Sequence, residues 1–407
     1  MSSRAALRRE PGAGKLPLAE WIAVTLLDRA LRHLDGGTLD VTLPDGSSRQ
    51  FGHGPAADIQ IHSDTLFRRL ATRGKVGFGE SYTAGEWDTS DLPALFELLL
   101  RNAEAANKRH GTIRRILDAR PRPNRRNGLL RARHNIAYHY DLGNDLFERM
   151  LDETMTYSCA IFESPGEPLA DAQRRKYRRI CDQLELGPDD HVLEIGCGWG
   201  GFALLAASEF GCRVTGLTLS AEQAKFARAR IAEAGLTDRV QIVEEDYRSH
   251  QGSYTRVASI EMLEAIGEKQ FPTYFAAIDR LLVPGGRACV QTILVPDNRY
   301  DRYRKAPDWI EQYIFPGCLI PSLSALAEAS KKASSLLLSE VHEIGPHYAE
   351  TLKRWRENFD AHIEEIQTLG YDERFVRTWH FYLTFCEAAF RTRALRDVQL
   401  TLRRPFE

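Results

Sequence analysis

Four of the six residues from 196 to 201 are glycines, and they separate a short apolar run at 192–195 from a helix-favouring run at 202–207. A strand, a glycine turn and a helix in this order are typical of a nucleotide-cofactor loop at the carboxyl edge of a parallel sheet. Glycine suits such a loop because the backbone turns tightly and a Cβ would collide with a closely packed ligand. The chemistry that this stretch favours is therefore cofactor binding.

The glycines follow an acid in the pattern E-x-G-x-G-x-G-G, which begins at Glu194 and differs from the dinucleotide fingerprint G-x-G-x-x-G. An acid at the strand end suits a ligand with cationic groups, such as the amino and sulfonium groups of S-adenosylmethionine. Residues 216–220 lack the ribose-binding acid that is usual at the second strand end of dinucleotide sites. Asp246, after the third strand, is placed to accept a hydrogen bond from an adenine amino group.

The residues around this loop alternate between strand and helix patterns. Strands are predicted at 212–219, 239–243, 257–263 and 288–295, and helices at 168–186, 221–234 and 270–282. Ser220 is a favourable N-cap for the second of these helices. Such alternation over about 110 residues predicts an α/β fold with a doubly wound parallel sheet, in which every strand's carboxyl end lies on one edge.

The first 110 residues predict a smaller α+β domain. Residues 16–34 have helical apolar spacing, which favours packing inside this domain, with a membrane-surface helix as the alternative. Turn signals within 37–62 predict a β-hairpin or small sheet, and 64–104 predicts short helices.

A basic linker is predicted at 111–133. Ten Lys and Arg residues between 108 and 133 face a single acid, Asp118, and Pro, Asn and Gly residues interrupt any long helix. The linker is either a solvated tether or a patch that attracts anionic phosphate head groups, to which each basic residue contributes about 1 kcal/mol. Nucleic acid is disfavoured because no aromatic residue interleaves these charges before Tyr138.

Composition limits the remaining possibilities. The net charge of −2 provides no global field for nucleic acid. Seven dispersed cysteines without a C-x-x-C pair predict reduced cytosolic thiols rather than disulfides or a metal site. Because no apolar run approaches the roughly 20 residues of a membrane span, any membrane role is expected to be peripheral.

The second domain is predicted to run from 134 to 407. An irregular aromatic segment at 297–325 is expected to cover the sheet edge, as part of an insertion around 297–345. Long helices at 348–368 and 373–397 and a final strand at 398–402 complete this domain.

Seven motifs occur in a fixed order in this chain. They are YHYDLGNDLF (138–147), TYSCAIFE (156–163), LEIGCGWGGFA (193–203), GLTLSAEQ (216–223), SIEMLEAIGEKQFPTYF (259–275), QYIFPGCLIPS (312–322) and FCEAAFRTR (385–393). The chain thereby resembles the cyclopropane-fatty-acyl-phospholipid synthase family, S-adenosylmethionine-dependent enzymes that methylate a double bond within a lipid acyl chain. The resemblance implies a Rossmann-like class I methyltransferase sheet.

The resemblance also implies roles for individual residues. The expected cofactor-binding residues are Tyr157, Ser158, Glu194, Gly196, Gly198, Gly200, Thr218, Ser220, Gln223, Asp246 and Tyr247. The reacting centre is expected to comprise Cys159, Glu264, Gln291, the Ile293 backbone and Tyr348. Several members of the family hold a bicarbonate ion there as the base.

The chemistry explains these residue types. An alkene is a weak nucleophile, so the methyl group must be held close and in line with it. Methylation leaves a carbocation, which requires a dry site with aromatic lining. Candidates for that lining, each of which could instead be ordinary core, are Tyr138, Tyr140, Tyr157, Phe162, Tyr313 and Phe315. Glu264 is expected to orient the base or to act as the base itself. Cys159 is not expected to be a nucleophile, because no activating His adjoins it.

Two positions depart from the family pattern. Ala265 and Gln291 stand where many members have His, and Gln can bind bicarbonate but cannot take a proton at neutral pH. We predict that the product is a cyclopropane acyl chain. The alternative is a methylene-branched chain formed after a hydride shift, because only the placement of the base separates the two outcomes.

We therefore predict a cytoplasmic enzyme, peripheral on the inner face of the cell membrane, that methylates monounsaturated phospholipid acyl chains. Remoter alternatives are a small-molecule methyltransferase and a lipid-binding protein with a relict site. The oligomeric state is left open, with a homodimer through the N-terminal domain as one candidate.

Overall fold

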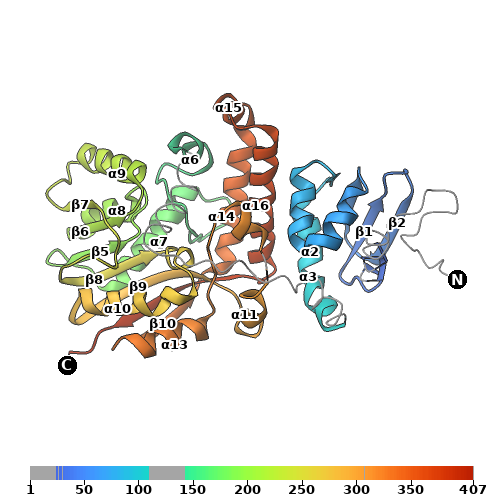
Figure 1. The fold of residues 1–407 in the computed structure, drawn as a ribbon. Helices are drawn as coiled ribbons and strands as arrows, with labels where there is room; N and C mark the ends of the chain where they lie inside the picture. The colour runs from blue at the N-terminus through green and yellow to red at the C-terminus, as the bar shows by residue number, and fades with distance from the viewer. Residues whose placement is uncertain (1–23, 26, 30, 110–142, 307, 407) are drawn as a thin grey trace. The chain divides into compact units, whose positions relative to one another are not determined.

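The computed structural model describes residues 24–109, 143–306 and 308–406, apart from residues 26 and 30. The chain forms two units (Figure 1), the first comprising Met1–Pro123, Lys305–Tyr313 and Ile363–Ala394, and the second comprising Asn124–Arg304, Ile314–His362 and Leu395–Glu407. The predicted linker at 111–133 and most of the predicted helix at 16–34 lie outside the described residues.

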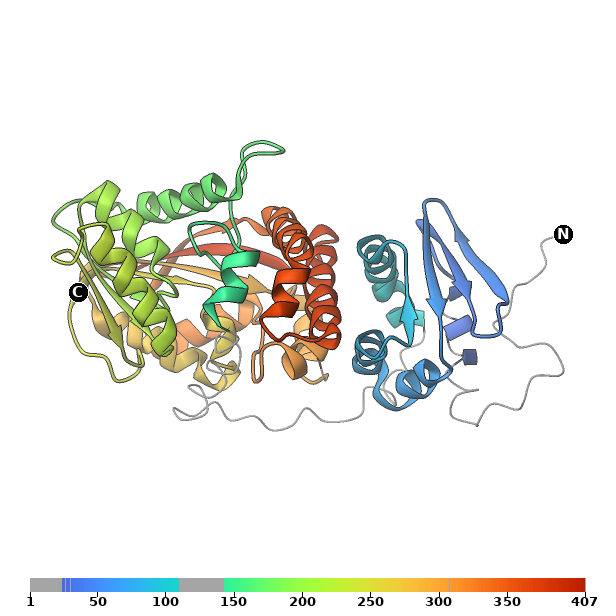
Figure 2. The same cartoon turned by 90° about the horizontal axis from the view of Figure 1, so that it is seen from above.

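The first unit contains a four-stranded sheet with the order β2-β1-β3-β4. The strands are β1 (Gly37–Thr42), β2 (Ser48–His53), β3 (Ala56–Ile61) and β4 (Trp87–Asp88). The predicted hairpin is confirmed, since β1 and β2 pair antiparallel. The helices of this unit are α2 (Thr65–Thr83), α3 (Leu92–Arg109), α12 (Trp309–Tyr313), α15 (Ile363–Thr368) and α16 (Glu373–Arg391), and Figure 2 shows α2 and α3 beside the small sheet.

Helix α16 joins this unit although it is remote in sequence. The ring of Phe96 on α3 lies edge-on to Phe381 and Phe385 of α16, at centroid distances of 5.0 and 5.6 Å. Arg377 of α16 also forms an ion pair with Asp88, at 2.7 Å. The first unit thus includes residues 363–394, which the sequence-based division places with the second domain.

The second unit contains a seven-stranded sheet with the order β10-β11-β9-β8-β5-β6-β7. Its strands are β5 (His191–Ile195), β6 (Arg213–Thr218), β7 (Val240–Glu244), β8 (Tyr254–Ile260), β9 (Leu282–Leu294), β10 (Leu337–Glu343) and β11 (Arg396–Arg403). Strands β5 to β9 are parallel, whereas β11 is antiparallel to both β9 and β10. The predicted doubly wound, Rossmann-like class I methyltransferase fold is confirmed.

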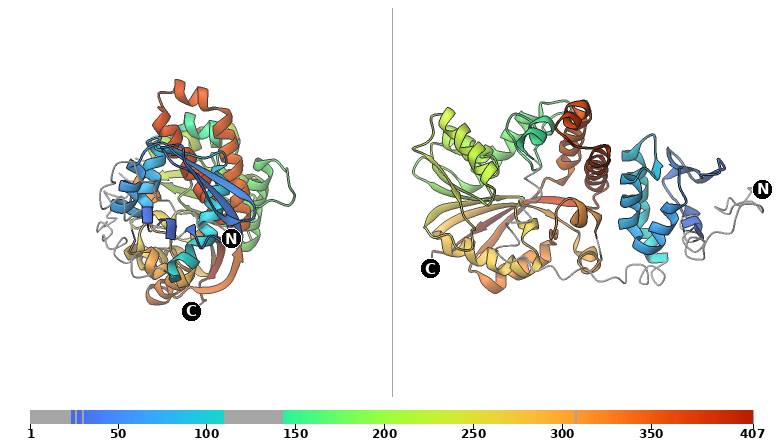
Figure 3. Two further views of the ribbon diagram at one scale, coloured as in Figure 1. Left: turned by 90° about the vertical axis from the view of Figure 1, so that its right-hand side faces the viewer. Right: turned by 45° about the horizontal axis from the view of Figure 1, so that its top comes forward.

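Helices cover both faces of this sheet (Figure 3). The helices of the second unit are α6 (Asn144–Met150), α7 (Leu169–Leu184), α8 (Gly201–Phe210), α9 (Ala221–Glu233), α10 (Phe271–Leu281), α11 (Asp297–Tyr303), α13 (Leu323–Ala333) and α14 (Gly345–Ala361). Helices α7, α8 and α9 share one buried apolar core with the sheet. Helices α10 and α13 share a second core on the opposite face. The site therefore rests on a sheet that is buried on both sides.

Several boundaries differ from the sequence prediction. The helix expected at 348–368 is divided into α14 and α15, and the helix expected at 373–397 ends at Arg391, before β11 begins at Arg396. The strand expected at 257–263 ends at Ile260, because Glu261 adopts a left-handed backbone (φ 49°) and a 3-10 turn, η1 (Leu263–Ala265), follows. Strand β9 begins at Leu282, before the expected turn at 284–286, and its pairing with β8 shifts register near that point. The segment at 297–325 is not wholly irregular, because α11 and α12 lie within it and α13 begins there.

The predicted helix cap is confirmed. Ser220 caps α9, its hydroxyl oxygen accepting a hydrogen bond from the Gln223 N–H. All seven cysteines lie among the described residues, and none of them forms a disulfide bond there. Over the described ranges, none of the helices combines the length and the apolar character needed to cross a membrane.

Candidate functional site

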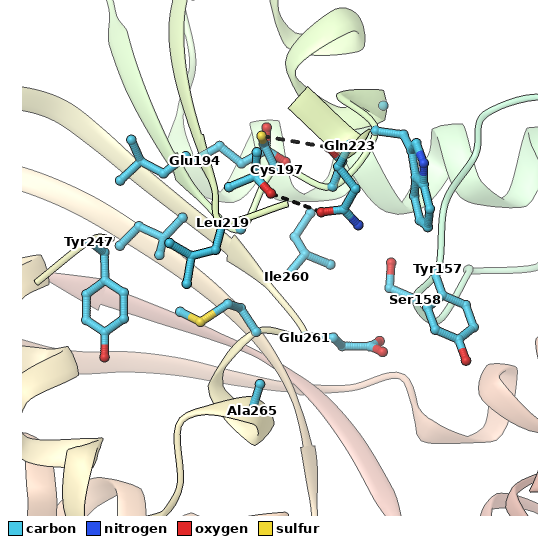
Figure 4. A pocket seen from close by; sticks show the side chains of 18 of the residues that line it. Tyr157, Ser158, Glu194, Cys197, Leu219, Gln223, Tyr247, Ile260, Glu261 and Ala265 are labelled. Carbon is cyan, nitrogen blue, oxygen red and sulfur yellow. Dashed lines mark hydrogen bonds between the residues drawn. The ribbon is translucent and has the colours of Figure 1, made fainter. Parts of the chain in front are cut away.

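A cavity opens at the carboxyl ends of β5, β6 and β8, where the strand order reverses direction. Strand β5 lies between β6 and β8, and in sheets of this type ligands bind in the crevice at such a switch point. The cavity is lined by the glycine loop, by residues after β6, β7 and β8, and by the segment at 155–158 (Figure 4). Nine of the eleven predicted cofactor residues line this cavity, and the two that do not are Gly200 and Ser220.

The glycine loop depends on backbone conformations that favour glycine. Gly196, Gly198 and Gly200 have φ angles of 85°, 52° and 82°. A Cβ added at Gly201 would lie 3.0 Å from both the Thr154 carbonyl oxygen and the Tyr177 hydroxyl, whereas one added at Gly198 would meet nothing within 4 Å. The space beside Gly198 is therefore open.

Glu194 supplies a buried acid to the same cavity. It sits in β5 opposite Gly216 of β6 and Ala258 of β8, and its Oε2 is buried without a hydrogen-bond partner among the described residues. Burial raises the pKa of Glu194 well above its ordinary value, and the charge of Lys176 partly opposes this shift. A buried carboxyl without a partner is costly unless a cationic ligand group satisfies it.

The turn between β6 and α9 carries three predicted cofactor residues. The Thr218 hydroxyl donates to the Gln223 Oε1 at 3.0 Å and accepts from the Ser220 N–H at 3.2 Å. Thr218 and Gln223 line the cavity, while Ser220 acts as the helix cap. The side chain of Gln223 is thus held in place at the cavity wall, as Figure 4 shows.

Asp246 and Tyr247 line the cavity after β7. The Asp246 carboxylate is paired with the Arg248 guanidinium, with 2.6 Å between Oδ2 and Nη2. The Tyr247 hydroxyl is buried and has no hydrogen-bond partner, and its ring lies edge-on to Tyr274. Any contact of Asp246 with an adenine amino group stays a prediction.

Aromatic rings surround Tyr157 at the other side of the cavity. Its ring lies 5.4 Å from Phe147, 5.0 Å from Trp355 and 6.4 Å from Phe315, centroid to centroid. Tyr157 and Phe315 thus lie in the predicted aromatic environment.

The other aromatic candidates lie elsewhere. Tyr313 belongs to the first unit, where its hydroxyl donates to Glu80 at 2.5 Å. Phe162 is partly buried in the second unit, where its backbone N–H donates to His347. Tyr138 and Tyr140 lie outside the described residues.

Glu261 organises the predicted reacting centre. Its Oε1 accepts hydrogen bonds from the Cys159 N–H and from the Gln291 side-chain amide, both at 2.8 Å. Its Oε2 accepts from the Tyr348 hydroxyl at 2.5 Å. Three residues predicted to surround the reacting atoms are therefore brought together, and they meet on a carboxylate that the sequence prediction had not selected.

Glu264 and Ile293 form a separate pair next to this group. The Glu264 Oε1 accepts from the Thr292 hydroxyl at 2.7 Å and from the Ile293 N–H, while its Oε2 is buried and has no partner in the described part of the chain. Burial, reinforced by the charge of Glu261, raises the pKa of Glu264 to about 7. Glu264 does not line the cavity, whereas Glu261 does.

The orientation of Gln291 follows from its neighbour on β11. The Gln399 side-chain amide donates to the Gln291 Oε1 at 3.1 Å, so the Gln291 N–H groups point toward Glu261 and Asp397. Burial, and then the charge of Glu261, raise the pKa of Asp397 well above its ordinary value. Burial thus favours the neutral form of Asp397 beside the carboxylate of Glu261.

Cys159 and Lys176 complete the cluster. The Cys159 thiol donates to the Ala160 carbonyl at 3.2 Å, and burial raises its pKa well above the ordinary value. A thiolate nucleophile is thus disfavoured, as expected. Lys176 is fully buried, its Nζ lies 2.6 Å from the Ser158 Oγ, and burial lowers its pKa to about 8.

Sequence reasoning missed three residues of this cluster, namely Glu261, Lys176 and Asp397. Glu261 lies three positions before Glu264 in the same motif, so its proximity to the strand end was a usable signal. Asp397 is an acid within an otherwise buried strand, which is also unusual. Lys176 carries no comparable signal, because a lysine in an amphipathic helix is ordinarily solvated.

Comparisons with known proteins show the family of this chain. A family model described as mycolic acid cyclopropane synthetase matches residues 128–400. The chain is 40% identical to the tuberculostearic acid methyltransferase UfaA1 of Mycobacterium tuberculosis, over 97% of this chain and 95% of that protein. It is 38% identical to the cyclopropane-fatty-acyl-phospholipid synthase of Escherichia coli, over 84% of this chain and 86% of that protein.

Solved structures show the same fold. The cyclopropane synthase MmaA2 of Mycobacterium tuberculosis superposes with a TM-score of 0.63 at 30% identity, covering 67% of this chain and 98% of that one. The mycolic acid cyclopropane synthase CmaA1, solved with SAH and CTAB, gives a TM-score of 0.62 at 30% identity with the same coverage.

Proposed function

The chain belongs to the mycolic acid cyclopropane synthetase family and is an S-adenosylmethionine-dependent methyltransferase, and from that premise we propose that it methylates the double bond of an unsaturated acyl chain in a phospholipid. One observation carries the proposal. A single cavity is bordered by the glycine loop, by the unpartnered carboxyl of Glu194, by the ring of Tyr157 and by the carboxylate of Glu261. A methyl donor and a proton acceptor can therefore act on one substrate in the same cavity.

The residues present fit S-adenosylmethionine. The Glu194 Oε2 lacks a partner and can accept from the amino cation of the ligand, and the open space beside Gly198 leaves room for it. Gln223 and Tyr247 offer further polar groups at the cavity wall. When bound, S-adenosylmethionine supplies an electrophilic methyl group. The chain's own part is to hold the alkene close and in line with that methyl.

The aromatic group around Tyr157 is suited to the cation that methylation leaves on the substrate. Phe147, Trp355 and Phe315 surround Tyr157 and restrict access of water to that side of the cavity. Ring faces also attract positive charge. A proton acceptor is then required, and the cluster centred on Glu261 adjoins the same cavity.

We propose a cyclopropane acyl chain as the product, formed when the added methyl loses a proton and the ring closes. A methylene-branched chain is the second candidate, because one relative that matches nearly the whole chain is named a tuberculostearic acid methyltransferase rather than a cyclopropane synthase. Both candidates share the methyl transfer and differ in the subsequent rearrangement of the cation.

An enzyme that methylates a phospholipid must reach its substrate at a membrane surface. We propose a cytoplasmic enzyme bound peripherally to the inner face of the cell membrane, with the basic residues between 108 and 133 as the attracting segment. A homodimer through the first unit is a further proposal, testable by sedimentation. The bicarbonate base implied by the family resemblance conflicts with the hydrogen bonds that Glu261 accepts from Cys159, Gln291 and Tyr348.

The test is incubation with methyl-labelled S-adenosylmethionine and vesicles of monounsaturated phospholipid, followed by mass spectrometry of the released acyl chains. We expect the label in acyl chains that have gained one methylene unit in mass. Hydrogenation then separates the products, because a methylene branch takes up hydrogen readily and a cyclopropane resists mild conditions. Label transfer to soluble substrates but never to vesicles would contradict the proposal.

A further inference from the structure

We propose that Glu261 is the general base of this enzyme and that its carboxylate takes the place of a bicarbonate ion. The inference rests on the proposed function, since a base is needed only if a cation forms on the substrate. It concerns the groups that the family resemblance assigns to bicarbonate, namely Cys159, Glu264, Gln291, the Ile293 backbone and Tyr348.

The Glu261 carboxylate already occupies an anion site built by three of these groups. It accepts from the Cys159 N–H and the Gln291 amide at 2.8 Å each, and from the Tyr348 hydroxyl at 2.5 Å. A carboxylate and a bicarbonate present the same pair of oxygens on a planar carbon. Donors that would hold the ion therefore hold Glu261 equally well.

The Ile293 N–H and the Cys159 thiol are also engaged, while the Glu264 Oε2 has no partner among the described residues. The Ile293 N–H donates to the Glu264 carboxylate, and the Cys159 thiol donates to the Ala160 carbonyl. Each donor assigned to bicarbonate thus has an acceptor among the described residues. A free ion would have to displace Glu261 before it could bind, so the residues present do not fit bicarbonate.

Glu261 also lies where a base is needed. It lines the cavity together with Met262, Ala265 and Ile266, and Figure 4 shows its carboxylate directed toward the side where Ser158 and Tyr157 lie. Its left-handed backbone (φ 49°) is rare for a residue with a side chain, and such strain is concentrated at functional sites. The end of β8 and this conformation together direct the carboxylate to the cavity.

Two buried acids and a buried lysine lie near Glu261. Burial and the charge of Glu261 raise the pKa of Asp397 well above its usual range and that of Glu264 to about 7. Both acids therefore retain protons to higher pH than an ordinary carboxyl. The buried ammonium of Lys176 interacts favourably with Glu261.

In the proposed step, Glu261 takes a proton from the transferred methyl group. A C–H bond of the transferred methyl breaks, and its electron pair forms the second carbon–carbon bond of the ring. The proton passes to an oxygen of Glu261, which becomes a neutral carboxylic acid and later releases the proton to solvent. In the methylene alternative the same oxygen takes the proton while the electron pair forms a carbon–carbon double bond.

Two variants and a binding measurement test this inference. Glu261→Gln keeps the shape of the side chain but removes its basicity, and we expect turnover to fall by roughly 10²-fold or more. Glu261→Gly removes the side chain at a position where the left-handed backbone suits glycine. The donors of Cys159, Gln291 and Tyr348 then become free to bind an added anion. Glu328→Gln, an exposed acid on α13, is the matched control and should behave as wild type.

Bicarbonate dependence is the deciding readout. In carbonate-free buffer the wild type should retain its turnover, whereas Glu261→Gly should lose turnover. Addition of millimolar bicarbonate should then raise the turnover of Glu261→Gly by roughly 10-fold or more. Without substrate or cofactor, bicarbonate should raise the melting temperature of Glu261→Gly relative to chloride at equal ionic strength, and leave the wild type unchanged.

The proposal is overturned if wild-type turnover depends on added bicarbonate, if bicarbonate stabilises the wild type as much as Glu261→Gly, or if Glu261→Gln retains full turnover. If Glu261→Gly fails to fold, the turnover of Glu261→Gln and the bicarbonate dependence of the wild type still test the proposal. If no lipid accepts a methyl group, the proposed function fails while the melting-temperature comparison still reports on the anion site.

Discussion

The Thr292 hydroxyl donates a hydrogen bond to the Glu264 Oε1 at 2.7 Å, and the neighbouring Ile293 N–H donates to the same oxygen. The second oxygen of this carboxyl is buried and has no partner among the described residues. Burial, and then the charge of Glu261, raise the pKa of Glu264 to about 7, while the hydrogen bonds from Thr292 and Ile293 oppose this shift.

This shift predicts a pH dependence of stability. Because the folded-state pKa lies above the unfolded value of 4.5, the favourable contribution is complete below about pH 4.5 and is lost as pH rises through about 7. The loss should be about 3 kcal/mol in the free energy of unfolding. Glu264→Gln should remove it, as denaturant titrations of both proteins across this range would show. Parallel curves for the two proteins would contradict the shift.

Gly198→Val should abolish binding of S-adenosylhomocysteine. The side chain would enter the open space beside the loop from a left-handed backbone position, with φ at 52°. Gly235→Val is the matched control, because Gly235 also has a positive φ (67°) and nothing within 4 Å, but does not line the cavity. Calorimetry should detect binding to the control only. Equal affinity in both variants would refute the role of the loop.

Glu194→Gln should change stability and binding in opposite directions. Burial raises the pKa of Glu194, so the wild type loses stability as pH rises above about 4.5 and the variant should be the more stable protein at neutral pH. Cofactor affinity should fall by roughly 10-fold or more, because a neutral amide replaces an anion that can pair with a cation.

Glu222→Gln, at an exposed position in the first turn of α9, provides the control for Glu194→Gln. Thermal unfolding and calorimetry with S-adenosylhomocysteine measure the two effects. A variant at Glu194 with lower stability and unchanged affinity would count against the assignment.

Vesicle binding should depend on salt if the ten basic residues between 108 and 133 act as a membrane-attracting segment. Salt screens attraction between exposed charges. Sedimentation with vesicles of anionic lipid should therefore show weaker binding as ionic strength increases, and vesicles of neutral lipid should bind little at any salt concentration. Binding that ignores salt would argue for an apolar mode of attachment.

The sequence by itself determined the elements of the cofactor site. The order of strand, glycine turn and helix at 192–207 predicts the loop, and Ser220 predicts the cap of α9, because each feature depends on backbone conformation within a few residues. The family motifs extend this to the class of reaction. Gln291 and Ala265 were already visible as departures from the family pattern.

Tertiary structure decided which acid faces the substrate cavity. Glu261 and Glu264 lie three residues apart in one motif, and the sequence reasoning favoured Glu264. The left-handed turn at Glu261 places its carboxylate at the cavity, where Cys159, Gln291 and Tyr348 converge from separate parts of the chain. Such convergence depends on the packing of distant elements, so local patterns could not show that the donors assigned to a bicarbonate ion are already bound to a side chain.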